Sequence, residues 1–355
     1  MKKFFVIAAA ALVALAACTK AEINDADYQK SKEISFTAVN GKNTKAPLES
    51  QYYPTDIPFG VFAYALTQGQ TWAANSASGQ LYMNNETISY STTEDANGIY
   101  APSTTYYWPL SGSLTFIGYS PKATTGTVAY APATKALTVT DFTVNATAAS
   151  QQDLMWATTQ ADCTDETVAD KGNYLSASDD TQSTYKGVNM IFHHALSQVK
   201  FNVKKAAGLD DYTITVNSIT FDAYSKGTLT VTNDSPAWSA QAKQDAFVYN
   251  TNGTDVVAPN NSAEFAAFGV ANMPVPQTLA AATQTFTITY SLEKSGVNLG
   301  QKTVTMDLLG AQITAWAPNT IYNYNIVIDL KKIYFNPSIT DWETGASQVI
   351  NVPNA

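Results

Sequence analysis

Regular alternation of apolar and polar residues marks the second half of the chain. Val199, Phe201 and Val203 fall on one side of a short segment, and the intervening residues are Lys200 and Asn202. The same period of two recurs in five further segments: residues 212–217, 228–232, 286–290, 304–308 and 322–329. A period of two with one polar face predicts antiparallel β-sheets that are buried on one side and wet on the other.

The first half predicts shorter strands that follow one another closely. Ile34, Phe36 and Ala38 alternate with Ser35 and Thr37 and indicate an early strand. Further apolar segments follow at residues 59–66, 106–109, 114–119, 137–139 and 154–156. No long stripe of period 3.6 occurs after the N-terminal segment. We therefore predict an all-β chain of two tandem antiparallel β-sandwiches, at residues 49–187 and 188–355, separated by the polar stretch that ends near residue 187.

The N-terminus has the pattern of an export signal. Lys2 and Lys3 precede a short apolar run, and the run ends in small residues directly before Cys18. This pattern resembles a bacterial lipoprotein signal, which implies removal of residues 1–17 and attachment of a diacylglycerol to the Cys18 thiol. An ordinary secretory signal with an accidental cysteine is the alternative. Acyl chains at Cys18 would hold the protein on the outer membrane, because each buried CH₂ contributes about 0.8 kcal/mol.

The charge and amino-acid composition of the chain limit which molecules and proteases can act as its partners. The formal net charge is −9, which disfavours nucleic acid because nothing offsets the repulsion from phosphates. Only 14% of the residues are charged, and all the basic residues are lysines, so an arginine-specific protease has no site in the chain. The second cysteine, Cys163, has no partner for an intrachain disulfide once Cys18 is acylated, and it is most simply a small buried residue.

Candidate catalytic and metal-binding groups are few. His193 and His194 are the only histidines, and neighbours in a strand point to opposite faces, so they cannot readily share a metal ion. Asp162, Asp165, Glu166 and Asp170 form an acidic loop whose oxygens could hold Ca²⁺, although clustered carboxylates of this kind are more often simply a solvated loop. We nominate no catalytic residue, no metal site and no cofactor.

Several segments, taken in order, resemble the fimbrillin family of Bacteroidetes, which comprises lipoprotein pilins and their accessory subunits. The resemblance rests on the segments around Cys18, Ile34–Ala38, Thr44–Ala46, Phe59–Tyr64, Tyr106–Pro109, Phe116–Pro121, Phe192–Val199 and Trp316–Tyr324. It spans nearly the whole chain.

The resemblance implies two transthyretin-like sandwiches, surface display and, in stalk members, proteolytic removal of the first strand. The groove left behind takes a strand from the next subunit, so that the partners are other pilin subunits joined head to tail. Residues 18–48 would then comprise a tether and a removable plug strand with Ile34, Phe36 and Ala38. Stalk members are cut after arginine, whereas this chain has Lys45 before Ala46.

The ends of the chain leave alternatives open. The resemblance offers Ile333 and Phe335, or Ile350 and Val352, as the donated strand, but these residues are equally the last strands of the second sandwich. If the bond between Lys45 and Ala46 is never cut, the subunit is an anchor, a cap or a stand-alone adhesin for a host or bacterial receptor. A surface lipoprotein that binds glycans for nutrient uptake is a further alternative, with exposed tryptophans as its binding groups.

Overall fold

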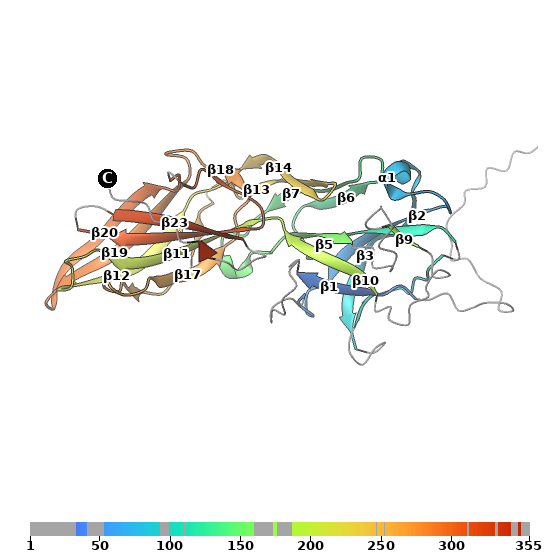
Figure 1. Cartoon of the computed structure of the whole chain (residues 1–355). Coiled ribbons are helices and arrows are strands. Elements are labelled where there is room, and N and C mark those ends of the chain that lie inside the picture. Colours follow the sequence, from blue (N-terminus) through green and yellow to red (C-terminus); the bar gives the residue numbers. More distant parts are fainter. Residues whose placement is uncertain are drawn as a thin grey trace, which may run out of the picture.

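The computed structural model describes residues 33–40, 53–92, 99–109, 111–159, 173–175, 187–245, 247–251, 253–310, 312–330, 333–341 and 347–348. It confirms the all-β prediction. Figure 1 shows an elongated molecule with two lobes, joined along one side by a small sheet. The helical elements among the described residues are single turns: α1 (Trp72–Asn75) and two 3₁₀ turns at Ser76–Ser78 and Ala148–Ser150.

The sheet of the first lobe closes on itself. Its strands run in the order β2 (Phe59–Leu66), β3 (Gln80–Ser91), β4 (Ile99–Pro102), β1 (Phe36–Asn40), β10 (Val188–His194), β8 (Met155–Thr159), β5 (Ser113–Ser120) and β9 (Asn173–Leu175). β2 also pairs with β5 over residues 60–66. Seven strands therefore form a closed ring, and its interior is filled by apolar side chains from all of them.

β2 is buried on both of its faces, which explains why its sequence is a continuous apolar run rather than an alternating one. Phe59, Val61 and Ala63 point into the ring. Phe62 and Tyr64 point outward and pack against Tyr130 of β6 (Thr127–Ala131), at 6.4 and 5.5 Å between ring centroids.

The second lobe consists of two sheets packed face to face. One contains β17 (Ala266–Asn272), β11 (Ser197–Lys205), β22 (Thr320–Ile328), β23 (Ile333–Asp341) and β24 (Ser347–Gln348). The other contains β15 (Tyr249–Asn250), β12 (Tyr212–Phe221), β19 (Thr285–Lys294) and β20 (Val297–Asp307), with β16 (Val256–Val257) beside β12. Phe201 of β11 meets Phe221 and Phe286 of the opposite sheet at 5.6 and 5.7 Å. The alternation predicted for residues 199–203, 286–290 and 322–328 is confirmed by their burial.

A four-stranded sheet joins the two halves of the chain. Its order is β14 (Ser235–Ala242), β13 (Lys226–Thr232), β7 (Ala136–Thr143) and β6, and β7 of the first half pairs with β13 of the second. In Figure 1 this sheet runs along the top of both lobes. β18 (Gln277–Thr278) and β21 (Ala315–Trp316) form a separate two-stranded ribbon.

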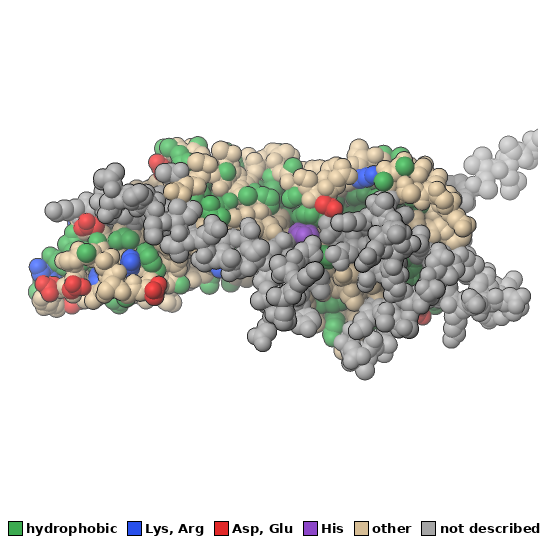
Figure 2. Space-filling model, viewed as in Figure 1, with side chains coloured by type: hydrophobic (Ala, Val, Ile, Leu, Met, Phe, Trp, Pro, Cys, Tyr) green, Lys and Arg blue, Asp and Glu red, His purple; other side chains and the backbone are tan. Residues whose placement is uncertain are grey.

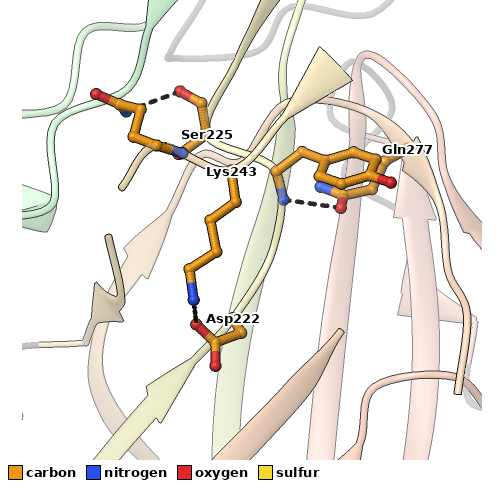
Figure 3. Close-up of polar contacts among 6 residues, drawn as sticks. Asp222, Ser225, Lys243 and Gln277 are labelled. Carbon is orange, nitrogen blue, oxygen red and sulfur yellow. Dashed lines mark hydrogen bonds and ion pairs between the residues drawn. The ribbon is translucent and has the colours of Figure 1, made fainter. Parts of the chain in front are cut away.

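Polar contacts hold the connection between β12 and β13, as Figure 3 shows. Lys243 forms an ion pair with Asp222, and the backbone N–H of Tyr224 donates to Oε1 of Gln277 at 2.9 Å. The backbone N–H of Gln244 donates to the Ser225 hydroxyl at 2.9 Å. One apolar core continues from β2 through this sheet into the second lobe, so the lobes share their packing.

Strand pairing refines two expectations. Most pairs are antiparallel as predicted, but β1–β10 and β11–β22 are parallel, because long stretches of chain separate the partners and can return in the same direction. Val188–His194, which the sequence analysis expected to open the second sandwich, pairs as β10 with β1 and β8 of the first lobe. The division into domains at residue 187 stays a prediction.

Within the described residues no helix is long and apolar enough to cross a membrane.

Candidate subunit-assembly site

The early strand β1 completes the ring of the first lobe. It pairs in parallel with β10 over five positions, from Phe36 opposite Val188 to Asn40 opposite Phe192. The backbone N–H of Val188 donates to the Ser35 carbonyl at 2.7 Å. On its other side, β1 meets β4 only where Phe36 lies opposite Tyr100. β1 is therefore held firmly by one neighbour and at a single position by the other.

The residues just before β1 add a second contact. The backbone N–H of Ile34 donates to the Tyr106 carbonyl at 2.8 Å, and Glu33 forms an isolated bridge with Tyr107. The strand predicted to end at residues 106–109 ends instead at Pro102 as β4. Burial is the main reason that the pKa of Tyr106 is raised to about 12, and the hydrogen bond from its hydroxyl to Glu86 adds to the effect.

The three residues of the predicted plug strand have buried side chains, and their role as a removable plug stays a prediction. Ile34, Phe36 and Ala38 are 3%, 0% and 7% exposed, whereas Ser35 and Thr37 between them are half-buried. The Phe36 ring packs edge to face on Phe59 and Phe116, with centroids 6.1 and 5.5 Å apart. Removing β1 would therefore leave an apolar groove between β4 and β10.

Gly187 brings the backbone of β10 unusually close to β1. Its φ of +117° is a conformation that other residues rarely adopt, and a Cβ atom built there would lie 2.9 Å from the backbone N and C atoms of Phe36. Glycine is thus required both by the backbone conformation at this position and by the close approach of the two strands. The sequence analysis did not single out Gly187, because a lone glycine after a polar stretch gives no sign of its partner.

The other predicted site residues divide between described and undescribed parts of the chain. Ile333 and Phe335 begin β23, which pairs antiparallel with β22 along its whole length, from Ile333 opposite Ile328 to Asp341 opposite Thr320. Four predicted groups lie outside the described residues: Cys18, the cut between Lys45 and Ala46, Ile350 with Val352, and the acidic loop at 162–170.

The two histidines take different surroundings. The ring of His193 stacks on Trp156 at 4.7 Å. His194 is nearly buried, and its Nδ1 lies 2.7 Å from Oδ2 of Asp153. No cluster of three metal-ligating side chains occurs among the residues that the structure describes.

A serine also lies in this region, but its contacts do not form a hydrolytic triad. Ser120 is fully buried, and its hydroxyl is 2.5 Å from that of Tyr53. A nucleophilic serine needs a base within hydrogen-bond reach and access for its substrate, and burial denies that access here.

Aromatic side chains serve mainly as core. Trp72, Trp108, Trp156 and Trp316 are each no more than 6% exposed, and Trp238 is half-buried with its indole N–H donating to the Ala195 carbonyl at 2.8 Å. On the face drawn in Figure 2 charged groups are sparse, and they gather toward the outer end of the second lobe. Four of the five described tryptophans are therefore core residues.

The comparisons with known proteins agree with this architecture. A model of the fimbrillin-like family matches residues 44–342. A fimbrial protein from Bacteroides vulgatus has 17% sequence identity and a TM-score of 0.61, with 87% of this chain and 99% of that chain covered. This likeness shows the fold.

Two further structures are similar at lower scores. A proposed cell adhesion protein from Bacteroides uniformis has 15% identity and a TM-score of 0.44, with 87% of this chain and 99% of that one covered. The fimbrial anchor protein Mfa2 from Porphyromonas gingivalis has 13% identity and a TM-score of 0.34, over 87% and 97% of the chains. No curated protein matches this chain. Because the family model covers most of the sequence, the chain belongs to the fimbrillin-like family, whose members are structural components of fimbriae at the cell surface.

Proposed function

We propose that this protein is a pilin or pilus-accessory subunit that joins its neighbours by donor-strand exchange and supports adhesion. The observation that carries the proposal is β1, a short strand that closes a ring and meets β4 at a single position. Phe36 and Ala38 of β1, together with Ile34 just before it, place three buried side chains in the core. A strand with these properties can be exchanged for another of similar pattern, because its side chains alone complete the core.

Release of β1 requires a cut in the chain after it. The bond between Lys45 and Ala46 lies between Asn40, where β1 ends, and Tyr53, where the described chain resumes. Hydrolysis there by a lysine-accepting protease adds one water molecule and leaves a carboxylate on Lys45 and an ammonium on Ala46. The N-terminal piece then remains only through non-covalent contacts, and an incoming strand can replace it.

The C-terminal segments are the proposed donors, and the groove favours one of them. Ile333 and Phe335 repeat the residue types and the spacing of Ile34 and Phe36, whereas Ile350 and Val352 place a valine where the groove holds a phenyl ring. A smaller side chain leaves a cavity, which costs about 24 cal/mol per Å³. Donation of Ile333 and Phe335 requires release of β23 from β22, which exchanges one set of strand pairs for another.

Membrane anchoring forms the second half of the proposal. Cys18 is the residue proposed to carry the acyl chains that hold the subunit at the outer membrane, and the long tether before β1 would keep the lobes clear of the lipid. A Cys18→Ala variant, followed by labelling with a radioactive fatty acid and by cell fractionation, tests this. Incorporation that survives the substitution would contradict the assignment.

Because the chain has no arginine, cleavage after residue 45 can be tested with a protease that cuts at a single site. Lys45→Arg creates the only arginine in the chain, so an arginine-specific endoprotease cuts at this position alone. We expect the cut protein to form head-to-tail polymers, visible by light scattering and negative-stain electron microscopy, and the uncut protein to stay unpolymerised. Phe335→Ala should block polymerisation more strongly than Val352→Ala.

Two results would overturn the proposal. One is a cut protein that loses residues 18–45 and stays monomeric at high concentration. The other is native surface protein whose N-terminus, read by mass spectrometry, retains Ile34–Ala38 although the protein has been recovered from polymeric fimbriae.

A further inference from the structure

Tyr53 returns the chain to the same core that β1 fills. It is the first described residue after the segment 41–52, and its side chain is 2% exposed. Its ring packs edge to face on Phe59 at 5.5 Å and on Tyr100 at 5.7 Å, and it lies against Phe192 at 4.7 Å. Tyr53 belongs to no strand, so its position depends on these contacts and on its hydrogen bonds.

The partners of Tyr53 belong to the two strands that flank β1. Tyr100 is in β4 and Phe192 is in β10, and β1 lies between these strands. The Tyr100 hydroxyl also donates to the Tyr53 carbonyl at 2.8 Å, and the Tyr53 hydroxyl is 2.5 Å from that of Ser120 in β5. A single residue outside the sheet therefore connects both neighbours of β1 from inside the ring.

This arrangement matters once β1 has left. The ring would then be open between β4 and β10, with no backbone pairing across the gap. An open apolar groove tends to collapse or to widen, because no strand then pairs with the facing edges of β4 and β10. Either change lowers the affinity of the groove for an incoming strand. Tyr53 follows the proposed cut, so it stays with the body of the subunit when the N-terminal piece departs.

We infer that Tyr53 is a positioning residue of the acceptor groove, which holds β4 and β10 one strand apart while the groove waits for the strand of another subunit. The inference rests on the proposed function. Its ligand is an extended segment with β-branched, aromatic and small side chains at alternate positions, as in Ile34, Phe36 and Ala38.

The test uses the full chain carrying Lys45→Arg, cut at this position and freed of the N-terminal piece. The probe is a synthetic peptide of residues 33–40, whose binding is measured by calorimetry and by fluorescence. We expect Tyr53→Ala to weaken binding of the peptide by about tenfold to a hundredfold, because both walls lose a buried aromatic contact. Tyr53→Phe keeps the ring and should change the affinity by less than about fivefold.

A matched control separates positioning from general loss of packing. Tyr90 packs edge to face on Tyr100 at 5.2 Å and is partly buried, but the structure gives it no ring contact with β10. Tyr90→Ala should therefore lower stability while leaving the affinity for the peptide within about threefold of the parent. If Tyr53→Ala prevents folding, Tyr53→Leu retains an apolar side chain and takes its place.

Hydrogen exchange supplies a readout that does not depend on assembly. In the cut protein, amides of β4 and β10 should exchange faster with Tyr53→Ala than with Tyr90→Ala. Equal affinities and equal exchange for the Tyr53 and Tyr90 variants would overturn the inference. Because the probe is the chain's own β1 peptide, this result is independent of whether the cut protein polymerises.

Discussion

Phe36→Ala is the sharpest test of β1 as a plug. The Phe36 side chain is fully buried, and it makes two edge-to-face contacts, with Phe59 and Phe116. Burial of a phenylalanine contributes about 1.5–3 kcal/mol, and each aromatic pair adds about 0.5–1.5 kcal/mol. Substitutions of this kind cost about 3–5 kcal/mol in practice, since the walls relax only in part.

The cost should be confined to the attachment of β1. In the Lys45→Arg chain after the single cut, the described contacts that hold the N-terminal piece are those of β1, the buried side chain of Ile34, and the backbone contacts of residues 33–35 with Tyr106, Tyr107 and Val188. A loss of about 3–5 kcal/mol corresponds to roughly two to three and a half orders of magnitude in the dissociation constant of this piece. Gel filtration after cutting, followed over time, measures its release.

Thr37→Ala provides the matched control on the opposite face of the same strand. Thr37 is half-buried, and its hydroxyl makes a single long contact of 3.4 Å with Oδ1 of Asn189, so we expect less than about 1 kcal/mol. Similar release rates for the Phe36 and Thr37 variants would refute the reasoning, because they would show that backbone pairing with β10, and not the buried side chains, retains β1.

Three further predictions concern single positions. Gly187→Ala should lower the free energy of unfolding by about 1–3 kcal/mol because of the backbone conformation at this position, and by more because Phe36 must shift. Urea unfolding of the uncut chain measures this loss, and an unchanged midpoint would contradict the prediction. Lys302 is exposed on the edge strand β20, opposite the buried Tyr290, and its charge disfavours pairing of β20 with the edge strand of another molecule. Lys302→Val should therefore promote self-association, whereas Lys302→Glu should not. Sedimentation velocity measures the difference. Burial, and to a lesser extent neighbouring Tyr90, raises the pKa of Tyr100 from 10.0 to about 12. The folded state therefore favours the neutral phenol, whose contribution to stability is complete below pH 10 and is lost as the pH rises toward about 12. Tyrosinate absorbance during alkaline unfolding will follow this loss.

The local pattern of the sequence determined much of this fold. Alternation at Val199–Val203 and Ile34–Ala38 correctly identified strands and their buried faces, because a strand points successive side chains to opposite sides whatever its neighbours are. The family segments also indicated a fimbrillin-like chain, since their order and spacing are written in the linear sequence. The pattern that predicts an export signal and the absence of arginine are likewise properties of the linear chain alone.

Tertiary structure decided which strands are neighbours. Strand pairing depends on contacts between distant residues, so no local pattern showed that Val188–His194 lies beside β1, or that β7 pairs with β13 across the two lobes. The close approach at Gly187 and the place of Tyr53 between β4 and β10 are of the same kind. Each is a contact between segments far apart in the sequence, and its energy depends on the position of the partner.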